Sequence, residues 1–95
     1  MPNRARKRTL QLVTEQVGQQ TYTYLPLGEY VVAAKGFCGG RPVIKYHRLD
    51  ARHLLALLRA GETPQQIAET YKIPVRAVEE VLELADQYDY EKSYV

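Results

Sequence analysis

The sequence IAETYKIPVRAVEEV at residues 67–81 is typical of two short helices joined by a tight turn. A helix-turn-helix needs a small residue where its helices cross, an apolar residue that fills the turn, and apolar residues three apart on its second helix. These places are taken by Ala68, Tyr71, Ile73, Val78 and Val81. Lys72 departs from the pattern, because glycine is commonest where such a turn takes a positive φ. The stretch predicts a helix-turn-helix whose turn lies near Lys72.

Three helices are expected between residues 50 and 87, where apolar residues recur about every 3.6 positions. Asp50 is a suitable N-cap for the first helix, and Gly61 marks its end. Thr63 and Gln66 form the pattern of a capping box at the start of the second helix. The expected inward residues are Leu54, Leu55 and Leu58, then Ile67, Ala68 and Tyr71, then Val75, Val78, Val81, Leu82 and Ala85.

The preceding residues, 10–49, are rich in β-branched and aromatic side chains and predict strands. Gly18 is expected in a tight turn, because glycine adopts a positive φ without a clash. The expected strands are 10–17, 21–25, 29–34 and a short extended piece at 42–45, with a glycine-rich loop at 35–40. Strands this few and short must pack on the helices or on a second copy of the chain.

Length and composition indicate one globular domain of 95 residues, divided into a basic arm (1–9), a β-rich segment (10–49), a helical bundle (50–87) and a tail (88–95). No apolar run approaches the roughly 20 residues that span a bilayer. The basic N-terminus leads into an alternating segment, which is not typical of a secretory signal. A single cysteine, Cys38, excludes an internal disulfide and suits a reducing compartment, so we expect a cytoplasmic protein.

Charge is divided between the halves of the chain. Residues 1–50 hold eight Lys and Arg against three acids, a formal charge of +5, and residues 51–95 hold five against eight, a formal charge of −3. This asymmetry favours an anionic partner for the first half, or contact between opposite halves of two copies.

Candidate nucleic-acid contacts are the cations Arg4, Arg6, Lys7, Arg8, Arg41, Lys45 and Arg76. A basic arm can enter a minor groove, but it can equally be a solvated terminus. Arg48 is expected to be structural, with its forked donors bridging the glycine loop. The outward residues expected on the third helix are Pro74, Arg76, Ala77, Glu79, Glu80, Glu83 and Asp86. One cation among four carboxylates opposes contact with phosphates, so direct major-groove reading by this helix is not favoured.

Candidate partner-binding residues are Tyr22, Tyr24, Tyr30, Glu79, Glu80, Glu83, Tyr88 and Tyr90. Strand tyrosines at alternate positions are expected to pair across strands over a core or a dimer interface rather than to stack on bases. The tyrosines of the tail, which include Tyr94, suit a segment that docks on a partner, or else belong to a frayed end.

Catalysis and metal binding are not expected. A catalytic cysteine activated by a base could be formed by Cys38, His47 and Asp50. Nothing in the sequence, however, indicates the geometry or the electropositive pocket that a reactive cysteine needs. Two histidines, His47 and His53, are too few for a metal site without carboxylates at ligand spacing. We therefore assign no catalytic residue, metal ligand or cofactor and no small-molecule substrate.

Two segments carry a resemblance to a known family: GRPVIKYHRL at residues 40–49, and AGETPQQI at residues 60–67 after the Leu54-Leu55 pair. Over about residues 36–86 the chain resembles the bacterial family catalogued as domain of unknown function 433, although His47 stands where threonine is frequent. The resemblance implies a homeodomain-like three-helix fold, kinship with antitoxins of type II toxin–antitoxin modules, and no catalytic activity. The expected fold class is α+β, an N-terminal β-hairpin or meander followed by a homeodomain-like helix-turn-helix bundle.

The leading hypothesis is a non-enzymatic regulatory protein of antitoxin type. It would be a homodimer held by strands and tyrosines, would bind DNA through its basic half, and would offer its acidic half to a toxin-like protein partner. The alternative is a protein–protein interaction or dimerisation module that binds no nucleic acid. Neither hypothesis involves a membrane.

Overall fold

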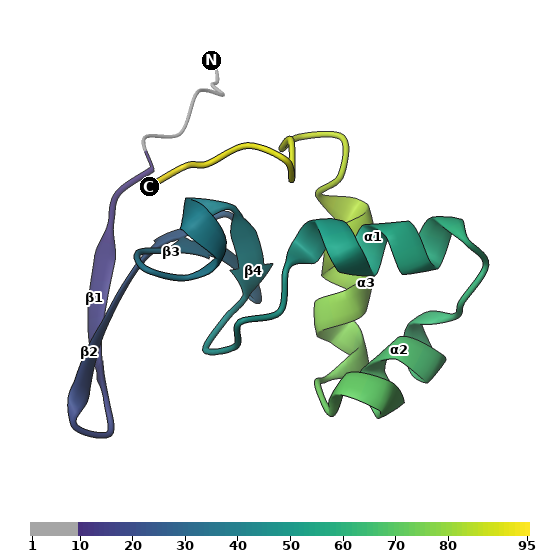
Figure 1. Ribbon diagram of the computed structural model, residues 1–95, viewed down its shortest axis with the longest axis horizontal. Helices are drawn as coiled ribbons and strands as arrows, with labels where there is room; N and C mark the ends of the chain where they lie inside the picture. The colour runs from purple at the N-terminus through teal and green to yellow at the C-terminus, as the bar shows by residue number, and fades with distance from the viewer. Residues whose placement is uncertain (1–9) are drawn as a thin grey trace, which may run out of the picture.

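The computed structural model describes residues 10–95 as an α+β protein, in which a four-stranded antiparallel sheet is followed by three helices. Figure 1 shows the sheet at one end of the molecule and the helices at the other. The elements are β1 (Val13–Val17), β2 (Gln20–Pro26), β3 (Val31–Ala34), the short 3-10 turn η1 (Cys38–Gly40), β4 (Pro42–Ile44), α1 (Ala51–Arg59), α2 (Pro64–Tyr71) and α3 (Val75–Glu83). No helix within 10–95 is long and apolar enough to cross a membrane.

The strands follow one another in the sheet in the order β1-β2-β3-β4, and each pair is antiparallel. Val17 pairs with Gln20 across a two-residue turn, in which Gly18 has a φ of 62°, as the sequence predicts. Since side chains alternate along a strand, Val31 and Ile44 project to the face that packs on the helices. The β1–β2 hairpin lies at the side of the molecule opposite the helices (Figure 1).

The caps predicted for the helices are confirmed. The Asp50 side chain accepts from the backbone amide of Arg52, and Thr63 and Gln66 make both bonds of a capping box. Lys72 follows α2 with a φ of 58°, so a lysine supplies the left-handed residue of the α2–α3 turn.

The β-meander and the three C-terminal helices predicted from the sequence are present, but the prediction of a homeodomain-like helix-turn-helix bundle is wrong. The helices do not close a core of their own, because one buried cluster unites Leu54, Ile67 and Val78 with Val31 and Ile44 of the sheet. The strands form one continuous four-stranded sheet. Sheet and helices therefore share a single core, and the sheet completes the packing that a self-contained bundle would have to supply.

The orientation of α3 explains this correction. Its buried residues are Ala77, Val78, Glu80 and Val81. Val75 and Leu82, which the sequence predicts to be inward, are 37% and 53% exposed. Ala77 and Glu80, which it predicts to be outward, are buried. Compared with the predicted orientation, α3 is thus rotated about its axis so that Ala77 and Glu80 are buried. Val75 and Leu82 remain at the surface.

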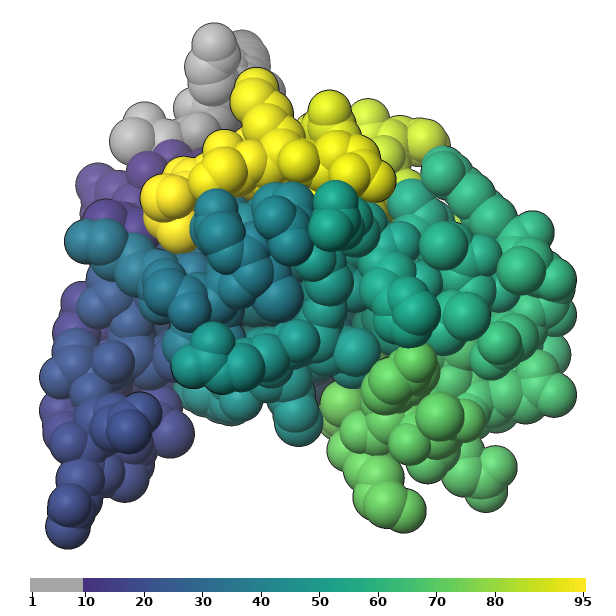
Figure 2. Space-filling view, in the orientation of Figure 1, coloured from purple at the N-terminus to yellow at the C-terminus, as the bar shows by residue number. Residues whose placement is uncertain are grey.

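The opposite face of the sheet carries a smaller core. Tyr22, Tyr24, Val32, Ala34 and Val43 form it, and Phe37 and Cys38 pack at its border. The C-terminal segment is fixed at the neighbouring glycine turn, where the Gly39 carbonyl accepts from the Ser93 hydroxyl at 2.7 Å and the Gly40 carbonyl accepts from the Tyr94 amide at 2.9 Å. Figure 2 shows this yellow segment lying against the blue-teal part of the chain.

Candidate interaction surface

Glu80 fixes α3 to the loop between β2 and β3. Its Oε1 accepts from the amides of Tyr30 at 2.7 Å and Val31 at 2.8 Å, and its Oε2 accepts from the amide of Glu29 at 3.0 Å. The side chain is only 6% exposed, so its charge is offset by three backbone donors rather than by a cation. Glu80 is therefore engaged within its own chain and offers no surface to a partner.

The residues of α3 that face away from the core form a stripe of mixed character, which we call the outer stripe: Val75, Glu79 and Leu82. Residues separated by three or four positions lie on one side of a helix, so the carboxylate of Glu79 stands between the two apolar side chains. The Glu79 side chain is 42% exposed, and Leu82 is more exposed than Val75. The outer stripe is thus apolar and acidic, and the core of the molecule is closed without it.

Arg76 lies beside the outer stripe and is held by carboxylates. Its guanidinium donates to both oxygens of Glu83, at 2.9 and 3.0 Å, and to Glu79 at 3.3 Å. The bond to Glu83, more than that to Glu79, raises the pKa of Arg76, and the same contact lowers the pKa of the Glu83 carboxyl. Arg76, a candidate nucleic-acid contact, is therefore neutralised on its own helix.

The two candidate cations of the sheet region are also paired. Arg41 donates through Nε and Nη2 to Asp50 Oδ2, at 3.2 and 3.0 Å. Lys45 Nζ lies 3.7 Å from Glu15 Oε2 and 4.7 Å from the centre of the Tyr24 ring. The remaining candidates, Arg4, Arg6, Lys7 and Arg8, lie outside the described residues.

Glu15 and Tyr46 have roles that the sequence pattern does not predict. Glu15 accepts from the hydroxyls of Tyr24 at 2.6 Å and Tyr46 at 2.5 Å, and these bonds, with Lys45, lower the pKa of its carboxyl. Tyr46 is half exposed, and its backbone amide donates to the hydroxyl of Tyr22. The alternation of side chains along the two strands places Glu15 opposite Tyr22 and could have indicated its contact with the strand tyrosines. Tyr46 lies in a loop and has a φ of 70°, which no sequence pattern predicts.

The strand tyrosines proposed for partner binding contact one another instead. Tyr22 and Tyr24 are buried with their ring centres 5.3 Å apart, and Phe37 meets Tyr22 edge-on at the same distance. Tyr30 is half-buried against the main core. Arg48 stacks over Phe37 at 4.3 Å and donates to the Gly36 carbonyl at 3.2 Å, which supports the prediction that it is structural.

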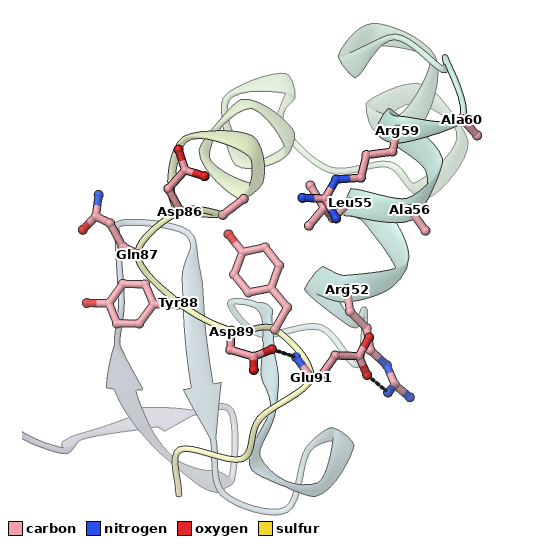
Figure 3. A pocket seen from close by; sticks show the side chains of 12 residues that line it. Arg52, Leu55, Ala56, Arg59, Ala60, Asp86, Gln87, Tyr88, Asp89 and Glu91 are labelled. Atoms are coloured by element: carbon pink, nitrogen blue, oxygen red, sulfur yellow. Dashed lines mark hydrogen bonds and ion pairs between the residues drawn. The ribbon is translucent and has the colours of Figure 1, made fainter.

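The tail is docked on its own chain. Tyr90 is buried and donates to the Val81 carbonyl at 2.5 Å, and burial raises the pKa of its hydroxyl. Tyr88 is half-buried, with its ring edge-on to Tyr94. An open groove of about 790 Å³ runs between α1 and residues 85–91 (Figure 3). Cations and carboxylates face each other across it, including the Arg52–Glu91 pair at 2.8 Å, so the groove carries no single sign of charge.

Three of the residues considered for catalysis or metal binding make separate contacts. Asp50 caps α1 and binds Arg41, and the Cys38 thiol lies 3.7 Å from the carbonyl of Arg48. His53 Nε2 lies 2.9 Å from the Tyr71 hydroxyl, where it joins α1 to α2. Within residues 10–95, no group of three or more His, Cys, Asp or Glu side chains is placed to hold a metal ion.

Strands β3 and β4 and the three helices match a known family of domains. The model of a family described as "Protein of unknown function (DUF433)" matches residues 31–85, from β3 to the turn after α3. The chain belongs to this family. The β1–β2 hairpin and the residues from 86 onward lie outside the match. No curated protein and no solved structure matches the chain.

Proposed function

We propose that this protein is a regulatory protein of antitoxin type that binds a basic protein partner through the outer stripe of α3. The observation that carries the proposal is that Val75 and Leu82 stay exposed on either side of Glu79 while the core closes without them. Exposed apolar side chains beside charged ones are typical of an interface. The kinship with antitoxins that the family resemblance implies agrees with this proposal.

The chemistry of the outer stripe defines the partner we expect. Glu79 and Glu83 together bind one cation, Arg76, so one negative charge remains and favours a cationic surface. The two apolar side chains favour a surface with an apolar depression. A nuclease has such a surface, because it must bind the phosphates of its substrate. An acidic helix laid over that surface would exclude the nucleic acid and speed association with the nuclease.

Co-expression tests the proposal. The product of the adjacent gene is the candidate toxin. It is induced in cells with and without this protein, and cell growth and the binding of the two proteins are measured. The wild-type protein is expected to restore growth, whereas the double variant Glu79→Lys/Leu82→Lys is expected not to restore it and to bind the toxin at least tenfold more weakly. Glu62→Lys/Glu69→Lys is the matched control, because it reverses two exposed acids that lie off α3, and it should still protect.

Two results would overturn the proposal. One is an adjacent gene product that neither slows growth nor binds the wild-type protein. The other is an outer-stripe variant that is folded by circular dichroism and protects as well as wild type.

A second candidate function is DNA binding through the basic arm. The supporting observation is the distribution of charge: residues 1–9 hold four cations and no acid, and residues 10–95 hold nine Lys and Arg against eleven Asp and Glu. Phosphate contacts make the affinity for DNA fall as the salt concentration rises. On a plot of the logarithm of the binding constant against the logarithm of the salt concentration, each contact adds about −0.9 to the slope. Removal of residues 1–9 should therefore flatten the salt dependence measured by gel shift on upstream DNA. If the intact chain binds no duplex at low salt, the protein is an interaction module without a nucleic-acid partner.

A further inference from the structure

The outer edge of the sheet at β1 is open among the described residues. β1 is the first strand in the sheet order, and within residues 10–95 only β2 pairs with it. The other edge strand, β4, is partly occupied by a bridge between Val43 and Asp50. An unpaired strand edge presents backbone N–H and C=O groups that another strand can bind.

β1 lacks the lysine, the proline and the bulge that often protect such an edge. Val13–Val17 contains no lysine and no proline, and its five consecutive pairs with β2 run without a bulge. Its only charged residue is Glu15, whose side chain lies over the face of the sheet and accepts from Tyr24 and Tyr46. Leu12 and Val17, at the two ends of the strand, are 52% and 42% exposed.

We infer that β1 is the interface for a second copy of this chain, paired antiparallel through the same strand around a two-fold axis. The two sheets would then join into one sheet of eight strands. β1 has a neighbouring strand on one side, and the second copy would give it a neighbour on both sides, at the centre of a larger sheet. This surface is distinct from the outer stripe of α3.

The sequence of β1 selects the register. An axis at Glu15 would place two carboxylates directly opposite each other, which is destabilising. An axis at Thr14 places Val13 opposite Glu15 and Leu12 opposite Gln16, so no like charges meet and the pairing extends over residues 11–17. An axis at Gln16 also pairs three residues of β1 with one another, but the turn at residues 18 and 19 ends the pairing there. An axis at Val13 pairs only Val13 of β1 with its own copy. The register centred on Thr14 separates the carboxylates, pairs three residues of β1 with one another and continues through Leu12 and Gln11.

A charge-swap experiment tests both the interface and its register. Full-length wild-type protein is expected to sediment as a dimer at micromolar concentration. Thr14→Lys alone and Thr14→Glu alone should each be monomeric, since like charges would lie opposite each other at the axis. A mixture of the two variants should sediment as a dimer again.

Thr23→Lys is the matched control. Thr23 lies opposite Thr14 on β2, and their hydroxyls are 3.2 Å apart, so both substitutions remove the same contact. The control should remain dimeric, because β2 is not at the edge. A monomeric wild-type protein, a dimeric Thr14→Lys variant, a monomeric control or a mixture that stays monomeric would each overturn the inference.

Discussion

At the scale of single residues, Glu80 decides which way α3 faces. Its two oxygens accept from three consecutive backbone amides, at Glu29, Tyr30 and Val31. Charge-assisted bonds of this kind are stronger than neutral ones, and a buried carboxylate that loses them is left unpaired. The helix is therefore held in the rotation that exposes Val75 and Leu82.

Gly28 permits the approach of Glu80. A Cβ at this position would lie 2.5 Å from Glu80 Oε1 and 2.8 Å from Leu84 Cδ1. Gly28→Ala should therefore lower the free energy of unfolding by about 1–3 kcal/mol, the usual cost of overpacking. Urea unfolding measures the loss. Glu29→Ala, at the exposed neighbouring position, should change it far less, and equal losses would speak against the close contact.

Glu15 links stability to pH. Its carboxyl has a lowered pKa because the hydroxyls of Tyr24 and Tyr46 and the charge of Lys45 favour the ionised form. A carboxyl whose pKa is depressed by folding contributes stability above its unfolded pKa, about 4.3, and that contribution is lost as the pH falls through the folded value. Wild type should therefore melt at a higher temperature than Glu15→Gln at pH 7, and the difference should shrink at pH 3. A difference in melting temperature that is the same at both pH values would contradict this role.

The sequence predicts some of these residues and not others, for a physical reason. The bonds made by Asp50 and Thr63 reach backbone amides two and three residues away, so a local pattern is sufficient. The amides bound by Glu80 lie 49 to 51 residues earlier in the chain. From the sequence alone, a glutamate in an acidic helix is therefore predicted to be solvent-exposed. Only the position of the sheet beside α3 shows that Glu80 is buried.

At the scale of elements, each helix is specified locally but oriented by the sheet. Hydrophobic periodicity predicts that residues 75–83 form a helix and that one face is buried. It does not predict that the sheet covers a second side of α3, where Ala77 and Glu80 lie. The buried face of α3 therefore differs from the predicted one. Val75 and Leu82, which the sequence predicts to lie in the core, belong to the outer stripe.

The capping box of α2 supports a helix of only eight residues. Thr63→Ala removes the acceptor for the Gln66 amide and should lower the free energy of unfolding by about 1 kcal/mol. Thermal or urea unfolding measures this loss. Thr70→Ala, at an exposed position within α2, is the control and should be close to neutral. Comparable losses from both substitutions would argue against a capping role.

At the scale of the whole molecule, the chain joins an acidic folded part to a basic arm. Composition predicts an excess of cations in residues 1–50 and an excess of acids in residues 51–95, since charge can be counted without a structure. Composition does not predict that Arg41, Lys45 and Arg76 are paired with carboxylates, because each partner is selected by the fold. The paired cations leave the arm as the part of the chain best suited to phosphates.

The tail belongs to the folded unit through Tyr90. Its hydroxyl donates to the Val81 carbonyl at the end of α3, in a buried position. Tyr90→Phe leaves that carbonyl without this donor and should lower the free energy of unfolding by about 1–2 kcal/mol. Tyr88→Phe, at a half-buried position nearby, should have a smaller effect. If both variants unfold at the wild-type urea concentration, the tail does not contribute to stability.

The orientation of α3 underlies both the shared core and the surface proposed for a partner, and backbone amide exchange in the Glu80→Gln variant tests it most directly. The Glu29, Tyr30 and Val31 amides should be protected in wild type and in Glu79→Gln. In Glu80→Gln at least one of these three amides should exchange at least about tenfold faster, because the NH2 group that replaces one carboxylate oxygen cannot accept a hydrogen bond. Exchange at the wild-type rate in Glu80→Gln would contradict the inward orientation of α3 and, with it, the assignment of its outer stripe.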